Sequence, residues 1–90
     1  MKGAIKVMKA YIYEWFNGIT GEQNIFINKD KAIHEYDYTL EHLTDSEKGN
    51  LEYYQLFEVE ATEEQIRDMQ ENGYSEDNST KWTKDIKSYK

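Results

Sequence analysis

Apolar residues recur with a period of two in the first part of the chain, which is the pattern of a β-strand. Residues 5–16 are β-branched and aromatic in both phases of that period, so the sequence predicts a strand at least partly covered on both faces. Asn17 and Gly18 are typical of a tight hairpin loop, and a second strand is predicted from Gln23 to Ile27. Together these segments predict an antiparallel β-hairpin.

A helix is predicted over residues 29–43, because the apolar residues there recur at intervals of three and four and form one stripe. The stripe consists of Ile33, Tyr36, Leu40 and Leu43. Asn28 precedes the helix and is suited to cap its first turn. Residues 44–50 are polar and are predicted to be a connector.

Residues 51–60 alternate again and predict a third strand with one apolar and one acidic face. The apolar face contains Leu51, Tyr53, Phe57 and Val59, and the acidic face contains Glu52, Tyr54, Glu58 and Glu60. We expect the acidic face to be exposed. Tyr54 is the best candidate for an exposed aromatic residue, because it lies on this face between Glu52 and Glu58.

A second helix is predicted from Glu63 to Asn72. Thr62 and Gln65 fit a capping box at its start, and Gly73 is suited to a left-handed C-cap at its end. The helix between these two signals is expected to be short.

The last part of the chain leaves two structures open. Residues 75–80 are typical of a loop, and residues 81–90 form a basic segment with three apolar residues, which is either a flexible tail or a fourth strand. The order strand, strand, helix, strand, helix predicts an α+β fold. We expect residues 1–90 to form a single domain, with two helices packed on a small antiparallel sheet.

Composition narrows the class of protein. The chain has 90 residues and no cysteine, which excludes disulfides and thiolate metal sites and is compatible with a reducing cytoplasm. Lysines interrupt the apolar residues near the N-terminus, and no run approaches the roughly 20 apolar residues of a membrane span. We therefore expect a soluble cytoplasmic protein without membrane contact.

Negative charge is concentrated in the middle of the chain. Fourteen of the eighteen acidic residues lie between Glu35 and Asp77, where Lys48 and Arg67 are the only basic residues. Both flanks are net positive. A field of one sign attracts partners of the opposite sign, so we expect a basic protein partner and no direct binding of DNA by this region.

The third strand and second predicted helix together provide a candidate partner-binding surface. Along one face of a strand, the Cα atoms of Glu58 and Glu60 would lie about 6.6 Å apart, which resembles the step between phosphates of a nucleic acid. The surface is predicted to contain Glu52, Tyr54, Glu58, Glu60, Glu63, Glu64, Asp68 and Glu71. Such a surface can occupy a Lys/Arg groove that otherwise binds DNA. The alternative is that these acids only solvate the strand and the helix.

No catalytic motif accompanies the acids. His34, Asp37, Glu41 and His42 lie on the first predicted helix, but the spacing of a zinc enzyme is absent. We therefore expect neither a metal site nor catalysis, and no cofactor.

The aromatic residues of the strands have three interpretations. They are Tyr11, Tyr13, Trp15, Phe16, Tyr53, Tyr54 and Phe57. They can form the core, anchor a protein partner, or stack on bases as in single-strand binders.

In size and charge the chain resembles the small acidic proteins by which bacterial viruses disable host proteins, including nucleic-acid mimics and anti-CRISPR or anti-restriction inhibitors. The likeness rests on the composition of residues 35–77. It implies a non-enzymatic inhibitor in the host cytoplasm, which occupies the nucleic-acid site of a basic host protein or defence nuclease. The candidate acids would then face Lys and Arg, with Tyr54 as a central anchor.

Two other functions stay open. One is a structural or regulatory interaction domain, such as a homodimer, that joins the hairpin or the tail and depends on Trp82 or Ile86. The other is RNA binding by the basic ends while the acidic body faces away. The lysines of those ends are Lys2, Lys6, Lys9, Lys81, Lys84, Lys87 and Lys90.

Overall fold

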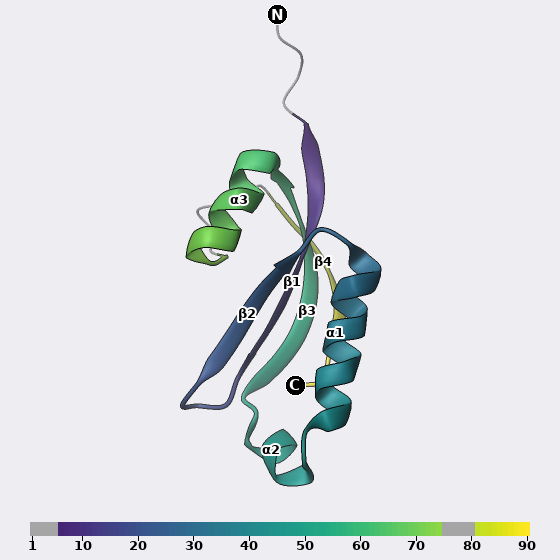
Figure 1. Ribbon diagram of the computed structural model, residues 1–90, viewed down its shortest axis with the longest axis vertical. Helices are drawn as coiled ribbons and strands as arrows, with labels where there is room; N and C mark the ends of the chain where they lie inside the picture. Colours follow the sequence, from purple (N-terminus) through teal and green to yellow (C-terminus); the bar gives the residue numbers. More distant parts are fainter. Residues whose placement is uncertain (1–5, 75–80) are drawn as a thin grey trace, which may run out of the picture.

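The computed structural model describes residues 6–74 and 81–90, which form a four-stranded antiparallel sheet and three helices (Figure 1). In chain order the elements are β1 (Val7–Phe16), β2 (Gly21–Phe26), α1 (Lys29–His42), α2 (Asp45–Asn50), β3 (Tyr53–Thr62), α3 (Glu63–Asn72) and β4 (Lys81–Ser88). The predicted α+β fold is confirmed. The loop predicted at residues 75–80 lies outside the described residues.

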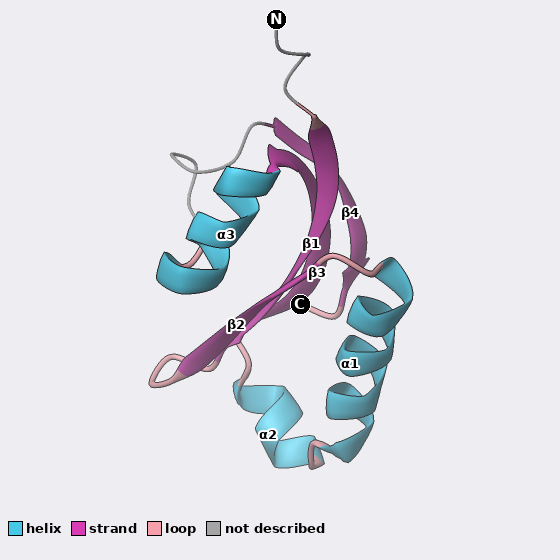
Figure 2. Cartoon of the chain, turned by 45° about the horizontal axis from the view of Figure 1, so that its top comes forward, coloured by secondary structure: helices cyan, strands magenta, loops and turns pink. Residues whose placement is uncertain are grey.

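The sheet has the strand order β2-β1-β3-β4, and all neighbouring strands are antiparallel. β1 and β3 are central and pair along their whole length, from Val7 opposite Thr62 to Phe16 opposite Tyr53. Figure 2 shows α1 and α3 on opposite sides of the sheet, with α2 beyond the end of α1. Both faces of the central strands are therefore covered, as the two apolar phases of the first strand predict.

Each face of the sheet has its own apolar core, because side chains alternate between the faces along a strand. The core under α3 contains Ala10, Ile12, Phe57, Val59, Ala61, Ile66 and Met69. The core under α1 contains Tyr11, Tyr13, Ala32, Tyr36, Leu51, Tyr54 and Leu56. The predicted stripe of α1 is confirmed, since Tyr36 is buried and the other three members pack against the α1 core.

Three tyrosines form a hydrogen-bonded chain in the α1 core. The Tyr13 hydroxyl donates to the Tyr54 hydroxyl at 3.0 Å, and the Tyr54 hydroxyl donates to the Tyr36 carbonyl oxygen at 2.7 Å. The rings meet edge to face, with centroids 5.4 Å apart for Tyr13 and Tyr54 and 4.8 Å apart for Tyr36 and Tyr54. Burial raises the pKa of Tyr54, and its hydrogen bond with Tyr13 raises that pKa further.

The N-caps of α1 and α3 agree with the sequence signals, whereas the C-cap predicted at Gly73 differs. Asn28 Oδ1 accepts a hydrogen bond from the Lys31 N–H at 3.0 Å, and Thr62 and Gln65 form the predicted capping box. Gly73 follows α3 with a positive φ of 91°. Its ψ of 158° lies outside the left-handed helical region expected for the C-cap.

The prediction that residues 44–50 are only a connector is wrong, because Asp45–Asn50 form the short helix α2. Thr44 Oγ1 accepts from the Glu47 N–H at 3.1 Å, and Glu47 Oε1 accepts from the Thr44 N–H at 2.8 Å. This second capping box satisfies two backbone donors that a six-residue helix would otherwise leave exposed.

The hairpin turn between β1 and β2 matches its Asn-Gly signal. Gly18 has a φ of 91°, which favours glycine. Asn17 Oδ1 accepts from the N–H groups of Ile19 and Thr20, at 2.9 and 2.8 Å. The turn is thus held by its own side chain.

The basic C-terminal segment is a strand rather than a flexible tail. β4 pairs antiparallel with β3 at the edge of the sheet, with two register shifts. Lys87 Nζ donates to Asp37 Oδ1 of α1 at 2.8 Å, and Ile86 packs against the α1 core. The alternative of a fourth strand is therefore the one observed.

Candidate functional site

The acidic face predicted for the third strand is not an exposed surface. Tyr54 is 0% exposed, and Glu58 is 2% exposed. α1 lies over the middle of this face, and Leu56, which shares the face with Tyr54 and Glu58, is also buried. The expectation that Tyr54 is an exposed anchor is therefore wrong, and so is the expectation that Glu58 faces a partner.

Glu58 is instead a buried carboxylate within the sheet. Its Oε1 lies 3.7 Å from Lys9 Nζ and has no hydrogen-bond partner in the described part of the chain. Tyr11 stands directly opposite on β1, and burial together with the Glu58 charge raises the pKa of the Tyr11 hydroxyl. The charge of Glu58 therefore acts on its own neighbours rather than on a partner.

The other predicted acids lie at two separate places. Glu52 precedes β3 beside the hairpin turn, whereas Glu60 is half-buried near the other end of the strand, about 26 Å away at the usual rise per residue. On α3, Glu63, Glu64 and Glu71 are exposed. Asp68 is half-buried and accepts from Asn72 Nδ2 at 2.7 Å. The structure thus brings the α3 acids together and leaves Glu52 apart from them.

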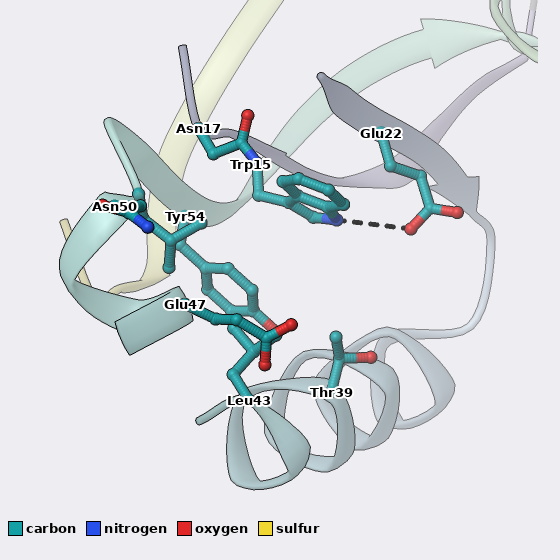
Figure 3. A pocket seen from close by; sticks show the side chains of 9 residues that line it. Trp15, Asn17, Glu22, Thr39, Leu43, Glu47, Asn50 and Tyr54 are labelled. Atoms are coloured by element: carbon teal, nitrogen blue, oxygen red, sulfur yellow. Dashed lines mark hydrogen bonds between the residues drawn. The ribbon is translucent and has the colours of Figure 1, made fainter. Parts of the chain in front are cut away.

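A hollow of about 170 Å³ lies between the hairpin, the end of α1, α2 and the start of β3, on the α1 side of the sheet (Figure 3). We call it the Trp15 pocket. Its lining consists of Trp15, Asn17, Glu22, Thr39, Leu43, Glu47, Asn50, Leu51 and Tyr54. Its apolar lining consists of aromatic and aliphatic side chains. The lining also contains two carboxylates, and it contains no lysine or arginine.

The positions of the two pocket carboxylates are fixed by hydrogen bonds. Trp15 Nε1 donates to Glu22 Oε1 at 3.3 Å, and these residues stand opposite each other on β1 and β2. Glu47 is held by the capping box of α2. Figure 3 shows the carboxylates of Glu22 and Glu47 and the indole of Trp15 around the same hollow. Neither carboxylate forms an ion pair with a described residue.

The sequence contains part of the signal for this pocket. The predicted hairpin brings Trp15 and Glu22 to neighbouring strands, where a carboxylate and an indole N–H can meet. The wall formed by α2 was not predicted, so Glu47 could not be placed there. A capping-box pattern from Thr44 to Glu47 is visible in the sequence and would have indicated α2.

The basic ends are partly used inside the molecule. Lys9 lies next to Glu58, and Lys87 pairs with Asp37. Lys90 Nζ donates to the carbonyl oxygens of Gly49 and Leu51, each at 3.1 Å. These contacts leave fewer lysines for RNA than the sequence suggests.

The histidines and acids of α1 do not form a metal site in the described residues, and His42 contacts its own helix. His42 stacks on Tyr38 with ring centroids 4.1 Å apart, and its Nδ1 lies 2.7 Å from the Tyr38 carbonyl oxygen. Within residues 6–74 and 81–90, no three His, Asp or Glu residues are grouped so that they could hold a metal ion.

In the same residues, no helix is long and apolar enough to cross a membrane.

The chain matches no protein-family model, no curated protein and no solved structure.

Proposed function

We propose that this protein is a small acidic binding protein, without catalytic activity, that binds a basic protein and blocks the nucleic-acid site of that partner. The observation that carries the proposal is the surface of α3, where Glu63, Glu64 and Glu71 are exposed and Arg67 is the one basic residue. The two ion pairs between described residues, Lys9–Glu58 and Lys87–Asp37, lie elsewhere.

The charges of α3 support a binding role. Glu63 and Glu64 lie in the first turn, where carboxylates stabilise the helix dipole, so their presence has a structural reason. Glu71 lies in the last turn, where a carboxylate opposes the dipole, and Arg67, the one basic residue of α3, lies four residues earlier on the same side of the helix. The helix carries four carboxylates against one cation, and this excess of negative charge attracts a basic partner and accelerates its approach.

The test is capture of partners from a bacterial lysate on the immobilised protein at low salt, with elution by a salt gradient. We expect a basic nucleic-acid-binding protein that free DNA displaces. The Glu71→Lys variant should weaken that binding by about three- to tenfold, as expected for the loss and reversal of one exposed charge pair.

Glu41→Lys is the matched control, because Glu41 is also exposed, lies in the last turn of α1, and changes the net charge equally. It should reduce the affinity less. Equal losses in the two variants would mean that only net charge matters, and an unchanged affinity in Glu71→Lys would exclude the α3 surface.

Self-association through β4 remains a second candidate, because Trp82 is 52% exposed on this edge strand. It predicts a dimer that is insensitive to salt and that is lost in Trp82→Ser. Sedimentation at low and high salt separates it from the first proposal, which predicts a monomer with a salt-sensitive partner.

A further inference from the structure

We infer that the Trp15 pocket is a binding site for one arginine side chain of a partner protein. The pocket and the α3 surface lie on opposite faces of the sheet, so this inference does not rest on the α3 acids. It adds a specific contact to the general attraction between an acidic protein and a basic one.

The size of the pocket limits what it can hold. Pockets for small-molecule ligands usually have volumes of roughly 300–1,000 Å³, whereas this hollow has about 170 Å³. That volume suits a single side chain rather than a nucleotide or a cofactor. The absence of a third metal-ligating residue in the described lining argues against a metal ion.

The charge of the pocket selects a cation. Glu22 and Glu47 line it, and no basic residue does. Lys90 lies beside the end of α2, but its ammonium is already bound by the carbonyl oxygens of Gly49 and Leu51. Glu22 and Glu47 are both exposed, so solvent partly screens their attraction for a cation, and the aromatic and aliphatic side chains of the lining add contacts that an open surface lacks.

The shape and chemistry of the walls favour arginine over lysine. A guanidinium is planar, stacks on aromatic rings and donates several hydrogen bonds in one plane, whereas an ammonium is a compact and strongly hydrated charge. Trp15, which is partly exposed and lines the hollow, supplies an aromatic ring next to the Glu22 carboxylate. The Tyr54 hydroxyl hydrogen is already donated to Tyr36, so Tyr54 has no hydroxyl donor left that would repel a cation's N–H groups.

The two tryptophans make the test direct. The indole N–H signal of Trp15 in a ¹H–¹⁵N NMR spectrum should shift in a saturable way on titration with N-acetyl-arginine methylamide. The signal of Trp82, which lies on β4 outside the pocket, is the internal reference. The corresponding lysine and citrulline compounds, at equal ionic strength, should bind at least about fivefold more weakly. The lysine compound lacks the planar guanidinium, and the citrulline compound lacks the positive charge.

Glu22→Gln keeps an oxygen that can accept the Trp15 N–H and removes one charge, so it should weaken arginine binding by about three- to tenfold. Glu52→Gln, with the same charge change beside the hairpin but outside the lining, should not. Equal shifts with the citrulline compound would show that the pocket does not select a positive charge. Equal affinity for the lysine compound would show that it does not select a guanidinium. Either result would overturn the assignment to arginine. Absence of saturation would exclude the site, and none of these results would affect binding through Glu71.

Discussion

Removing the hydroxyl of Tyr54 tests whether the tyrosine chain holds the α1 face of the sheet together. Tyr54→Phe keeps the ring and its edge-to-face contacts, but it removes the acceptor of the Tyr13 hydroxyl and the donor to the Tyr36 carbonyl oxygen. All three residues are buried, so water cannot replace either bond.

The cost follows from the two bonds. A buried hydroxyl left without a partner costs about 1–3 kcal/mol, and a lost neutral hydrogen bond about 1 kcal/mol. We therefore expect Tyr54→Phe to lower the free energy of unfolding by about 2–3 kcal/mol, a substantial part of the roughly 5–13 kcal/mol expected for a domain of this size. The melting temperature should fall by roughly 10–20 °C.

Urea denaturation followed by circular dichroism measures this loss, with an unchanged slope as evidence that the unfolding reaction is the same. Tyr38→Phe is the control, because Tyr38 is 52% exposed on α1, and it should change the free energy of unfolding by less than about 0.5 kcal/mol. Combining Tyr13→Phe with Tyr54→Phe should cost less than the sum of the two single changes, since both remove the same bond. A loss below about 0.5 kcal/mol in Tyr54→Phe, similar to the control, would refute the structural role of the chain.

Three further predictions concern the sheet and the turns. Since burial raises the pKa of Tyr54 above its ordinary 10.0, Tyr54 should lower the free energy of unfolding only above about pH 10, by up to about 1.4 kcal/mol per pH unit, so the decline at high pH should be less steep in Tyr54→Phe; an identical decline in that variant would contradict this. Lys9→Met leaves the Glu58 carboxylate buried without its cation and should lower the free energy of unfolding by about 1–3 kcal/mol, whereas Glu58→Met leaves a lysine that is 54% exposed and should cost less; chemical denaturation that gives the reverse order would argue against a buried ion pair. Gly18→Ala forces alanine to a φ of 91° and should destabilise by about 1–2 kcal/mol, whereas Gly49→Ala, with open space around the new Cβ in α2, should stabilise by about 0.5–1 kcal/mol in thermal melts.

The sequence predicts the elements of this fold better than it predicts their exposure. The hairpin, α1, α3 and the third strand follow from local signals, because caps, turns and periodicity depend on neighbouring residues. Whether one face of β3 is covered depends on where α1 lies, and that is a tertiary contact. Leu56, which shares a face with Tyr54 and Glu58, was the local sign that the acidic face is not wholly polar.

The candidate sites also differ in whether local signals or tertiary contacts determine them. The α3 acids were predicted as a group because one helix carries them, and α3 was predicted with its observed bounds. The Trp15 pocket needs four elements to meet, and one of them, α2, has only six residues with Gly49 among them. Periodicity cannot detect so short a helix, and the capping-box pattern of Thr44 and Glu47 was the local sign of it.

The strand order has a consequence for how the chain folds. β1 and β2 are joined by a short turn and can pair within microseconds, but β1 must also pair with β3, where Phe16 meets Tyr53, 37 positions later. Bringing β3 to β1 therefore requires closing a long segment that contains β2, α1 and α2, and the entropy of that closure is lost before either core is complete. We expect the arrival of β3 to limit the rate, so that refolding in a stopped-flow experiment takes milliseconds or longer, and refolding within microseconds would contradict this order of events. In this small chain the earliest contacts and the most stabilising ones would then be different contacts.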